Sequence, residues 1–171
     1  MGGHVTTPRD GFPPWGFRDD FNVQQDRAAA RVVFERCDPL VVPLAVTAEV
    51  TLRSSQVARL RAAGALGTLL ADQAEAHARD NGRTELGRAW PGLPDDLLNF
   101  QYDPLACAVA AGWDGVAIED IPTALDMRDG LLRMERWEGA PALRVVTEVD
   151  APRFDEAWLR AVERASGAAA S

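Results

Sequence analysis

The sequence predicts an α/β fold in which helices flank a mostly parallel β-sheet, with a small β-hairpin region added. Three observations lead to this prediction. Residues 40–46 form a continuous apolar run between turn signals, which is typical of a buried parallel strand. Segments with the apolar spacing of helices lie on both sides of that run. The last third of the chain holds strand-like segments and a closing helix.

The chain opens with a loop before its first predicted helix. Residues 11–17 (GFPPWGF) contain two prolines, which fix φ, and two glycines, which permit unusual backbone angles. Asp26 is expected to be the N-cap of a helix that extends to about Arg36, because apolar residues follow it at helical spacing. Residues 37–39 close this helix, and the apolar strand follows directly.

Two helices are expected after the apolar strand. Ser54 is expected to cap the first, which stops at Gly64. The second covers about residues 66–79 and ends before Asn81-Gly82, a common signal at the C-terminal end of a helix. The segment 83–98 carries mixed signals, with two prolines.

A short helix is expected to begin early in the second half of the chain. Asp103 would be its N-cap, Pro104 would take the first helical position, and Gly112 lies just beyond its end. The expected strands cover residues 116–121, 131–137 and 142–149, and the final helix covers 151–164 with Asp150 as its cap. We expect one domain over residues 1–166 and a disordered tail over 167–171.

Composition narrows the class of protein. The formal net charge of −8 predicts a surface that repels nucleic acid and anionic lipid. No run approaches the roughly 20 apolar residues of a membrane span, and residues 1–10 lack the apolar core of a secretory signal. Cys37 and Cys107 are expected to be small core residues in a reducing compartment, so the cytoplasm is the expected location.

Two clusters of polar residues stand in apolar surroundings, each close to a predicted helix start. The first covers residues 19–22 (DDFN) and the second covers residues 99–103 (NFQYD). A structural explanation exists for each, because Asp103 fits a helix N-cap and the other residues fit turns that bond their own backbone. Spacing alone therefore makes neither cluster a specific signal.

The order of five sequence blocks changes that interpretation. Together they resemble blocks of the inosine–uridine preferring nucleoside hydrolase family in the same order and near the same spacing. The resemblance implies the C-terminal half of a Rossmann-like nucleoside hydrolase fold. The blocks are Met1-Gly2-Gly3 (family "MGG"), Asp20 to Glu35 ("EFN…DPEAA…VFE"), Val42 to Thr47 ("VPLDVT"), Tyr102 to Ala106 ("HDPLA") and Val146 to Phe154 ("VDVERF").

The resemblance implies hydrolysis of the N-glycosidic bond of a ribonucleoside to free base and ribose. In this family a bound Ca²⁺ holds the ribose 2′- and 3′-hydroxyls and the attacking water. Calcium suits this work because it takes six to eight oxygen ligands, and a bound metal ion lowers the pKa of its water. Carboxylates near the ribose stabilise a transition state that resembles an oxocarbenium ion.

The matching positions imply roles for particular residues. Asp103 would be a calcium ligand, and Asn22 would bind ribose hydroxyls. Asp20 stands where the family has a ribose-binding glutamate and is one methylene shorter. Trp15, in the aromatic loop with Phe12 and Phe17, would stack on the base. The alternative for this loop is that its aromatic residues only fix it to the surface, and both readings stay open. Thr47 matches a family threonine to which we assign no catalytic role, and none is expected for His4 or His77.

The sequence departs from the family pattern in two places. Tyr102 stands where the family has a histidine that protonates the leaving base, and a reference pKa near 10 makes tyrosine a poorer acid at neutral pH. The family's Asp-rich loop of the form DxDxxxDD, which supplies most calcium ligands and the general base, has no counterpart in the chain. One carboxylate does not bind calcium tightly. The isolated chain is therefore predicted to be truncated and to have negligible hydrolase activity.

Three hypotheses follow. The chain is an enzyme completed by a missing N-terminal half, or it is a non-catalytic remnant or binding module that retains half of the fold. The third is a fortuitous resemblance, with some other α/β domain. Under the first two hypotheses the expected ligand of the chain is a ribonucleoside. Because a sheet without its leading strands exposes an edge and apolar surface, the chain is expected to form a homo-oligomer or to associate with the missing half.

Overall fold

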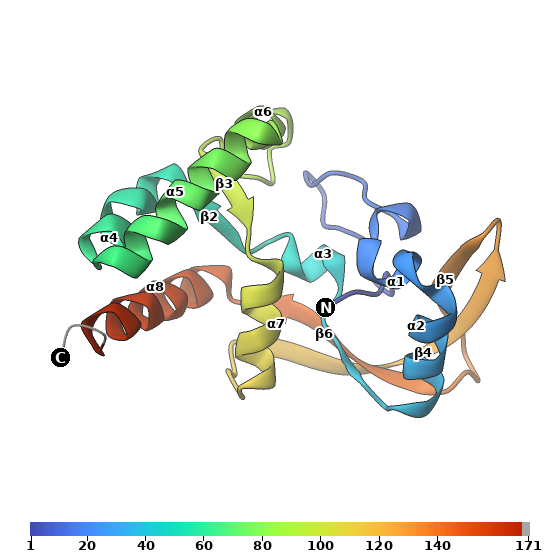
Figure 1. Ribbon diagram of the computed structural model, residues 1–171. Helices are drawn as coiled ribbons and strands as arrows, with labels where there is room; N and C mark the ends of the chain where they lie inside the picture. The colour runs from blue at the N-terminus through green and yellow to red at the C-terminus, as the bar shows by residue number, and fades with distance from the viewer. Residues whose placement is uncertain (169–171) are drawn as a thin grey trace.

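The computed structural model describes residues 1–168, which form two groups of elements with two helices between them (Figure 1). The central helices are α3 (Leu44–Thr47) and α7 (Tyr102–Ala110). The first group contains η1 (Phe17–Asp19), α1 (Phe21–Gln25), α2 (Arg27–Arg36), β1 (Leu40–Val41), β4 (Val116–Arg128), β5 (Leu131–Arg136) and β6 (Ala142–Val149). The second group contains β2 (Thr51–Arg53), η2 (Ser54–Gln56), α4 (Val57–Ala62), α5 (Ala65–Asp80), α6 (Arg83–Ala89), β3 (Leu97–Phe100) and α8 (Ala151–Ala168).

The larger sheet is mixed. Its strand order is β1-β6-β4-β5, in which β1 pairs with β6 in parallel and both other pairings are antiparallel. Strand β4 is long enough to pair with β6 along its first half and with β5 along its second half. Asp129 and Gly130 close the β4–β5 hairpin with φ of 54° and 74°, the positive angles of a two-residue turn. The α/β fold with its hairpin region is confirmed, whereas the expectation of a mostly parallel sheet is wrong.

The smaller sheet pairs β2 with β3 in antiparallel fashion and packs against α4, α5 and α8. Helix α5 presents a row of small side chains, Ala71, Ala74 and Ala78, to this core. Small residues let the helix approach the sheet closely, and Leu52 and Leu98 fill the space from the strand side. This group of elements fixes the end of β3 and thus the start of α7.

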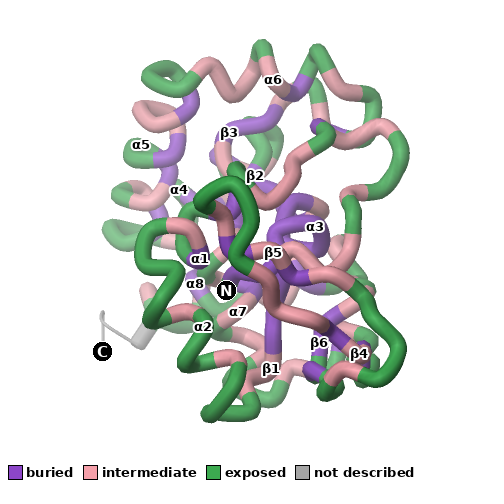
Figure 2. The backbone as a smooth tube through the Cα atoms, turned by 90° about the vertical axis from the view of Figure 1, so that its right-hand side faces the viewer, coloured by how far each residue is buried: buried purple, intermediate pink, exposed green. Residues whose placement is uncertain are grey.

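The apolar run at residues 40–46 is buried as predicted but is not a continuous strand. Only Leu40–Val41 is extended in the sheet, and Pro43 is the N-cap of α3 with φ of −78°. Proline fixes φ near this value and has no N–H to donate to a sheet, so the strand stops and a helix starts. Every residue of α3 is buried, and Figure 2 shows this helix in purple at the centre of the molecule.

Other predicted elements compare as follows. Asp26 caps α2 by accepting a hydrogen bond from Ala29 N at 3.0 Å, and α5 ends at Asp80 before the predicted stop signal. Ser54 does not cap a helix but begins η2, whose N-cap is Arg53. The last helix extends beyond the predicted end: residues 167 and 168 of the expected tail belong to α8, and 169–171 lie outside the described residues.

The prediction of two core cysteines is wrong. Cys37 and Cys107 are both free and exposed. Cys37 follows α2, a helix without a buried residue, in which Val32 and Val33 keep 51% and 44% of their surface exposed. Apolar spacing therefore predicted the helix but not the burial of its apolar face. Within residues 1–168, no helix combines the length and the hydropathy that crossing a membrane requires.

Candidate functional site

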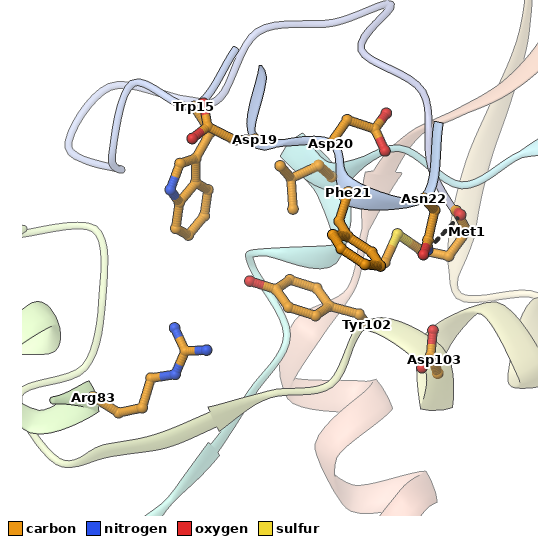
Figure 3. Close-up of a pocket in the computed structure, with 10 residues that line it drawn as sticks. Met1, Trp15, Asp19, Asp20, Phe21, Asn22, Arg83, Tyr102 and Asp103 are labelled. Atoms are coloured by element: carbon orange, nitrogen blue, oxygen red, sulfur yellow. Dashed lines mark hydrogen bonds between the residues drawn. The ribbon is translucent and has the colours of Figure 1, made fainter. Parts of the chain in front are cut away.

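A pocket of about 380 Å³ lies where the N-terminal segment faces the starts of α6 and α7 (Figure 3). All five residues that the sequence singled out line this pocket. The complete lining is Met1, Trp15, Asp19, Asp20, Phe21, Asn22, Leu44, Arg83, Tyr102 and Asp103. The structure thus brings the two polar clusters of the sequence to one place.

Asp20 holds the N-terminal segment to α1. It is the N-cap of α1, and its carboxylate accepts hydrogen bonds from Val23 N at 3.3 Å and from Gly3 N. Only 4% of its surface is exposed, and this burial raises the pKa of Asp20, while the two backbone hydrogen bonds act against the rise. Both carboxylate oxygens therefore have backbone partners in the pocket wall.

The glycine pair of the first sequence block has a packing reason. Gly3 has φ of 98°, and a Cβ atom at this position would lie 2.8 Å from Val41 Cγ1. Its neighbour Gly2, with φ of 141°, donates a backbone hydrogen bond to Val42 O at 3.0 Å. Only glycine fits this positive φ together with such a close approach. The block therefore attaches the first residues of the chain to the central segment.

Asn22 lies in the first turn of α1 and is exposed. Its side-chain Nδ2 donates a hydrogen bond to Met1 O at 3.1 Å. The amide is thereby held beside the first residue, and within residues 1–168 its Oδ1 has no hydrogen-bond donor. Figure 3 shows Asn22 and Met1 on the same side of the pocket as Asp103. The amide oxygen remains open to a ligand hydroxyl.

Asp103 lies in the first turn of α7 rather than at its N-cap. The helix begins at Tyr102, and the N-cap is Gln101, which is buried and donates its backbone N–H to Val50 O at 2.8 Å. The predicted capping role of Asp103 is therefore wrong. Its carboxylate is exposed and makes neither a hydrogen bond nor an ion pair with the part of the chain that the structure describes. The ordinary structural use of this carboxylate is absent, which leaves it available to a ligand.

Tyr102 forms the centre of the pocket. Its ring stacks on Phe100, with centroids 5.1 Å apart and planes 15° apart. Burial raises the pKa of Tyr102 to about 12, and the nearby Arg83 guanidinium acts in the opposite direction. The phenol therefore keeps its proton at neutral pH. It can donate a hydrogen bond, but it is a weak source of protons.

The aromatic residues of the loop differ in what they contact, so both roles left open above, stacking on a base and fixing the loop, are represented. Trp15 lines the pocket and meets the Phe100 ring edge-on, with centroids 5.4 Å apart. Phe12 packs in the cluster around Leu93, and Phe17 lies under the Arg133 guanidinium at 5.6 Å. Phe12 and Phe17 thus fix the loop, and Trp15 both packs against the same cluster as Phe12 and lines the pocket.

Two histidines have positions that the sequence did not show. His4 Nε2 lies 2.9 Å from Trp15 O, and this contact helps to hold the aromatic loop in place. His77 is half-buried, and Arg83 Nε donates to its Nε2 at 3.4 Å. Neither ring lines the pocket.

Arg83 is a pocket residue that sequence reasoning missed. It is the first residue of α6, it is half-buried, and its guanidinium lies 5.3 Å from the centre of the Phe100 ring. Within residues 1–168 no carboxylate lies within 4.0 Å of it, although the chain has 26 acidic residues. The sequence did not predict a helix at residues 83–89, because the two prolines of the segment 83–98 gave it mixed signals.

The oxygen atoms of this pocket do not fit calcium on their own. Across residues 1–168 there is no group of three or more His, Cys, Asp or Glu side chains placed to hold a metal ion. Asp20 uses both carboxylate oxygens on backbone N–H groups, and Asp19 accepts from Gly16 N at 2.8 Å. Asp103 is left as one free carboxylate, whereas calcium takes six to eight oxygen ligands.

Comparison with known proteins gives one family. A family model described as "Inosine-uridine preferring nucleoside hydrolase" matches residues 1–156. No curated protein matches the chain. Among solved structures, the chain is similar to a purine-preferring ribonucleoside hydrolase from Gardnerella vaginalis, with 24% identity and a TM-score of 0.70 over 97% of this chain and 51% of that chain.

The chain is also similar to a plant nucleoside hydrolase, with 16% identity and a TM-score of 0.66 over 95% of this chain and 51% of that chain. Both likenesses show the fold. The chain therefore spans about half the length of each of these two structures.

Proposed function

The chain belongs to the inosine-uridine preferring nucleoside hydrolase family, and from this premise we propose that its pocket binds the ribonucleoside in hydrolysis of the N-glycosidic bond to base and ribose. One observation carries the proposal: Asn22 and Asp103, which lie far apart in the sequence, line one pocket. Their side chains supply an amide oxygen and a carboxylate that no described residue occupies. Such groups accept hydrogen bonds from sugar hydroxyls.

The ribose would lie at the side of the pocket where Asn22, Met1 and Asp103 gather (Figure 3). Asn22 is held by its bond to Met1 O, so its oxygen keeps one orientation for a ribose hydroxyl. Asp20 supports this wall through Gly3 and Val23, and its carboxylate would also contact the sugar. A carboxylate oxygen has a second lone pair beyond the one that a backbone N–H uses. A ribose contact by Asp20 therefore adds to its structural bonds.

Calcium enters the proposal only as an ion to which Asp103 contributes one oxygen. The remaining ligands would come from outside residues 1–168, since among these residues no cluster of side chains completes the site. No reaction step through calcium follows for this chain.

Tyr102 would lie beside the leaving base. Because the pKa of Tyr102 is raised to about 12, its hydroxyl stays protonated and donates a hydrogen bond to the base. It replaces a proton transfer with a hydrogen bond, which activates the leaving group less. Trp15 adds a ring on which the base stacks.

A turnover assay with inosine and uridine, with and without calcium, tests this proposal. The isolated chain is expected to bind ribonucleoside and to turn it over far more slowly than the roughly 1–1,000 per second typical of enzymes. Turnover within that range would contradict the conclusion that the site of the isolated chain is incomplete. A lack of binding by every ribonucleoside would contradict the assignment of the pocket.

A second candidate function is a non-catalytic binding module, and the incomplete donor set favours it. The two differ in their response to a complementary half supplied in trans from a family member. If the chain is half of an enzyme, turnover appears on mixing and is lost with Asp103→Asn. A binding module would show ribonucleoside binding that the added half leaves unchanged.

We also propose that the protein works in a reducing compartment, the cytoplasm. Both cysteines are free and exposed, and exposed thiols persist where glutathione and thioredoxin keep them reduced.

A further inference from the structure

We propose that Arg83 reads the acceptor edge of the nucleobase and makes this site selective for 6-oxopurine ribonucleosides over adenosine. This inference rests on the proposed function, and it concerns a residue that the sequence blocks do not include. It is carried by the position of the guanidinium, by the partners it already has, and by the edge that those partners leave open.

The pocket has two chemically different sides (Figure 3). Asn22 and Asp103 lie on one side, where they suit a sugar. Trp15, Tyr102 and Arg83 lie on the other, with the Arg83 guanidinium directed at the space below Trp15 and beside Tyr102. A nucleoside that places its ribose on the first side therefore places its base against the second.

The two partners of Arg83 fix its orientation. His77 Nε2 lies 3.4 Å from Arg83 Nε and 3.3 Å from Nη2, so one edge of the guanidinium faces His77. The Phe100 ring, 5.3 Å from the guanidinium carbon, covers its face. The second edge, formed by Nη1 and Nη2, has no acceptor within residues 1–168. Two parallel N–H groups on that edge remain to be satisfied by a ligand.

The lack of a carboxylate partner distinguishes Arg83 because this arginine is not exposed. Some arginines on the surface pair with acids, as Arg59 does with Glu156 and Glu163 at 2.6 and 2.7 Å, and the other arginines without such a partner among residues 1–168 are exposed to solvent. Arg83 is half-buried, and no Asp or Glu of the described residues lies within salt-bridge distance. A partly desolvated cation without a counterion favours a ligand with electron-rich acceptors.

The open edge fits one class of base. A guanidinium pairs in bidentate fashion with O6 and N7 of guanine, two acceptors side by side, and hypoxanthine presents the same pair. Adenine presents N7 beside an N6 amino donor, which would face the guanidinium donor to donor. Arginine stays protonated at every relevant pH, so this discrimination does not depend on a proton.

Equilibrium binding of inosine and adenosine to the full chain, measured by calorimetry, tests the inference. The wild-type chain is expected to bind inosine at least about tenfold more tightly than adenosine. Arg83→Met should remove that preference by weakening inosine binding alone. The matched control is Arg88→Met, because Arg88 is an exposed residue of the same helix that lies outside the pocket.

A variant that gains binding of adenosine is also needed, because misfolding can explain a loss of binding but not a gain. An amide side chain pairs with N6 and N7 of adenine, so Arg83→Gln should turn the preference toward adenosine. Equal binding of both nucleosides by the wild-type chain, or equal weakening of both by Arg83→Met, would overturn the inference. If both nucleosides bind equally and Asp103→Asn abolishes binding, the proposed function survives and the role of Arg83 does not. If neither nucleoside binds, both fail together.

Discussion

Asn22 and Asp103 line one pocket because their segments attach to the same central stretch of chain. Gly2, beside the Met1 that holds Asn22, donates its N–H to Val42 O at 3.0 Å. Gln101, the N-cap of the helix that carries Asp103, donates its N–H to Val50 O at 2.8 Å. The stretch between these two carbonyls contains α3, which is buried throughout. A rigid buried segment thus sets the separation between the two sides of the pocket.

Asp103→Asn is expected to weaken ribonucleoside binding at least about tenfold and to leave the free energy of unfolding unchanged within about 0.5 kcal/mol. The carboxylate has no partner within residues 1–168, so its loss removes a ligand contact and no structural one. Calorimetric titration with inosine and urea unfolding measure the two quantities. Asp95→Asn, at another exposed aspartate, should change neither. A clear loss of stability in Asp103→Asn would mean that the carboxylate has a structural role.

Tyr102 is the only tyrosine, so the near-ultraviolet absorbance of tyrosinate reports its ionisation directly. Because burial raises the pKa of Tyr102 to about 12, the folded chain at pH 10 should show little tyrosinate. The urea-unfolded chain should be about half ionised at that pH, because the reference pKa of tyrosine is near 10. Identical titration curves for the folded and unfolded chains would show that the ring is solvated and the pocket open.

Gly3→Ala is expected to destabilise the fold by about 1–3 kcal/mol, since Gly3 combines a positive φ with a close approach to Val41. Gly16→Ala is the matched control: Gly16 has φ of −124°, and a Cβ atom there would meet nothing within 4 Å. Urea unfolding should separate the two variants. Equal stabilities would show that the first residues do not pack as described.

Asp155 is expected to make stability fall as pH rises from about 4 to 6. Burial raises the pKa of Asp155 from its ordinary value of 3.8 to about 6, and its hydrogen bond from Gln56 and the nearby Arg53 oppose the rise. A carboxyl whose folded pKa is raised favours the folded state below its unfolded pKa, and this contribution is lost as pH passes the folded pKa.

Asp155→Asn should therefore be more stable than the wild-type chain at pH 7, by about 1 kcal/mol after allowance for solvent screening. At pH 4 the difference should vanish. Thermal unfolding at several pH values gives the comparison, with Glu138→Gln, at an exposed glutamate, as the control. A variant curve parallel to the wild-type curve would rule out titration of Asp155 in this range.

The isolated chain is expected to self-associate. A groove of about 1010 Å³ between α7 and α8 is lined by large apolar residues, among them Trp113, Phe154 and Trp158. Apolar side chains that line an open groove favour association. Ala161→Glu places a charge in the groove and should weaken association in sedimentation equilibrium, whereas Ala58→Glu, on α4 outside the groove, should not. A wild-type chain that stays monomeric at all concentrations would contradict this expectation.

Local signals in the sequence predicted much of the fold. The caps Asp26 and Asp150 both accept hydrogen bonds from their helices, from Ala29 N and Arg153 N. The strand direction could not be read, because a buried apolar run looks the same in a parallel and in a mixed sheet. The run at residues 40–46 changes from strand to helix at Pro43, and apolar character alone does not reveal this change.

The order of the sequence blocks singled out Asn22, Asp20, Tyr102 and Asp103, and the aromatic loop added Trp15. All five line one pocket. Their individual roles remain predictions. Arg83 was missed because its significance depends on what is absent around it, a carboxylate partner, and only the folded chain shows such an absence among residues 1–168. His77 was missed for a related reason, since its partner Arg83 lies on the next helix.

The central claim is that one ligand occupies both sides of the pocket, and NMR titration of the ¹⁵N-labelled chain with inosine tests it most directly. The side-chain amide signals of Asn22 and the backbone signals of Tyr102 and Asp103 should shift together and fit a single dissociation constant. Shifts at α1 without shifts at α7, or two unrelated dissociation constants, would contradict the account.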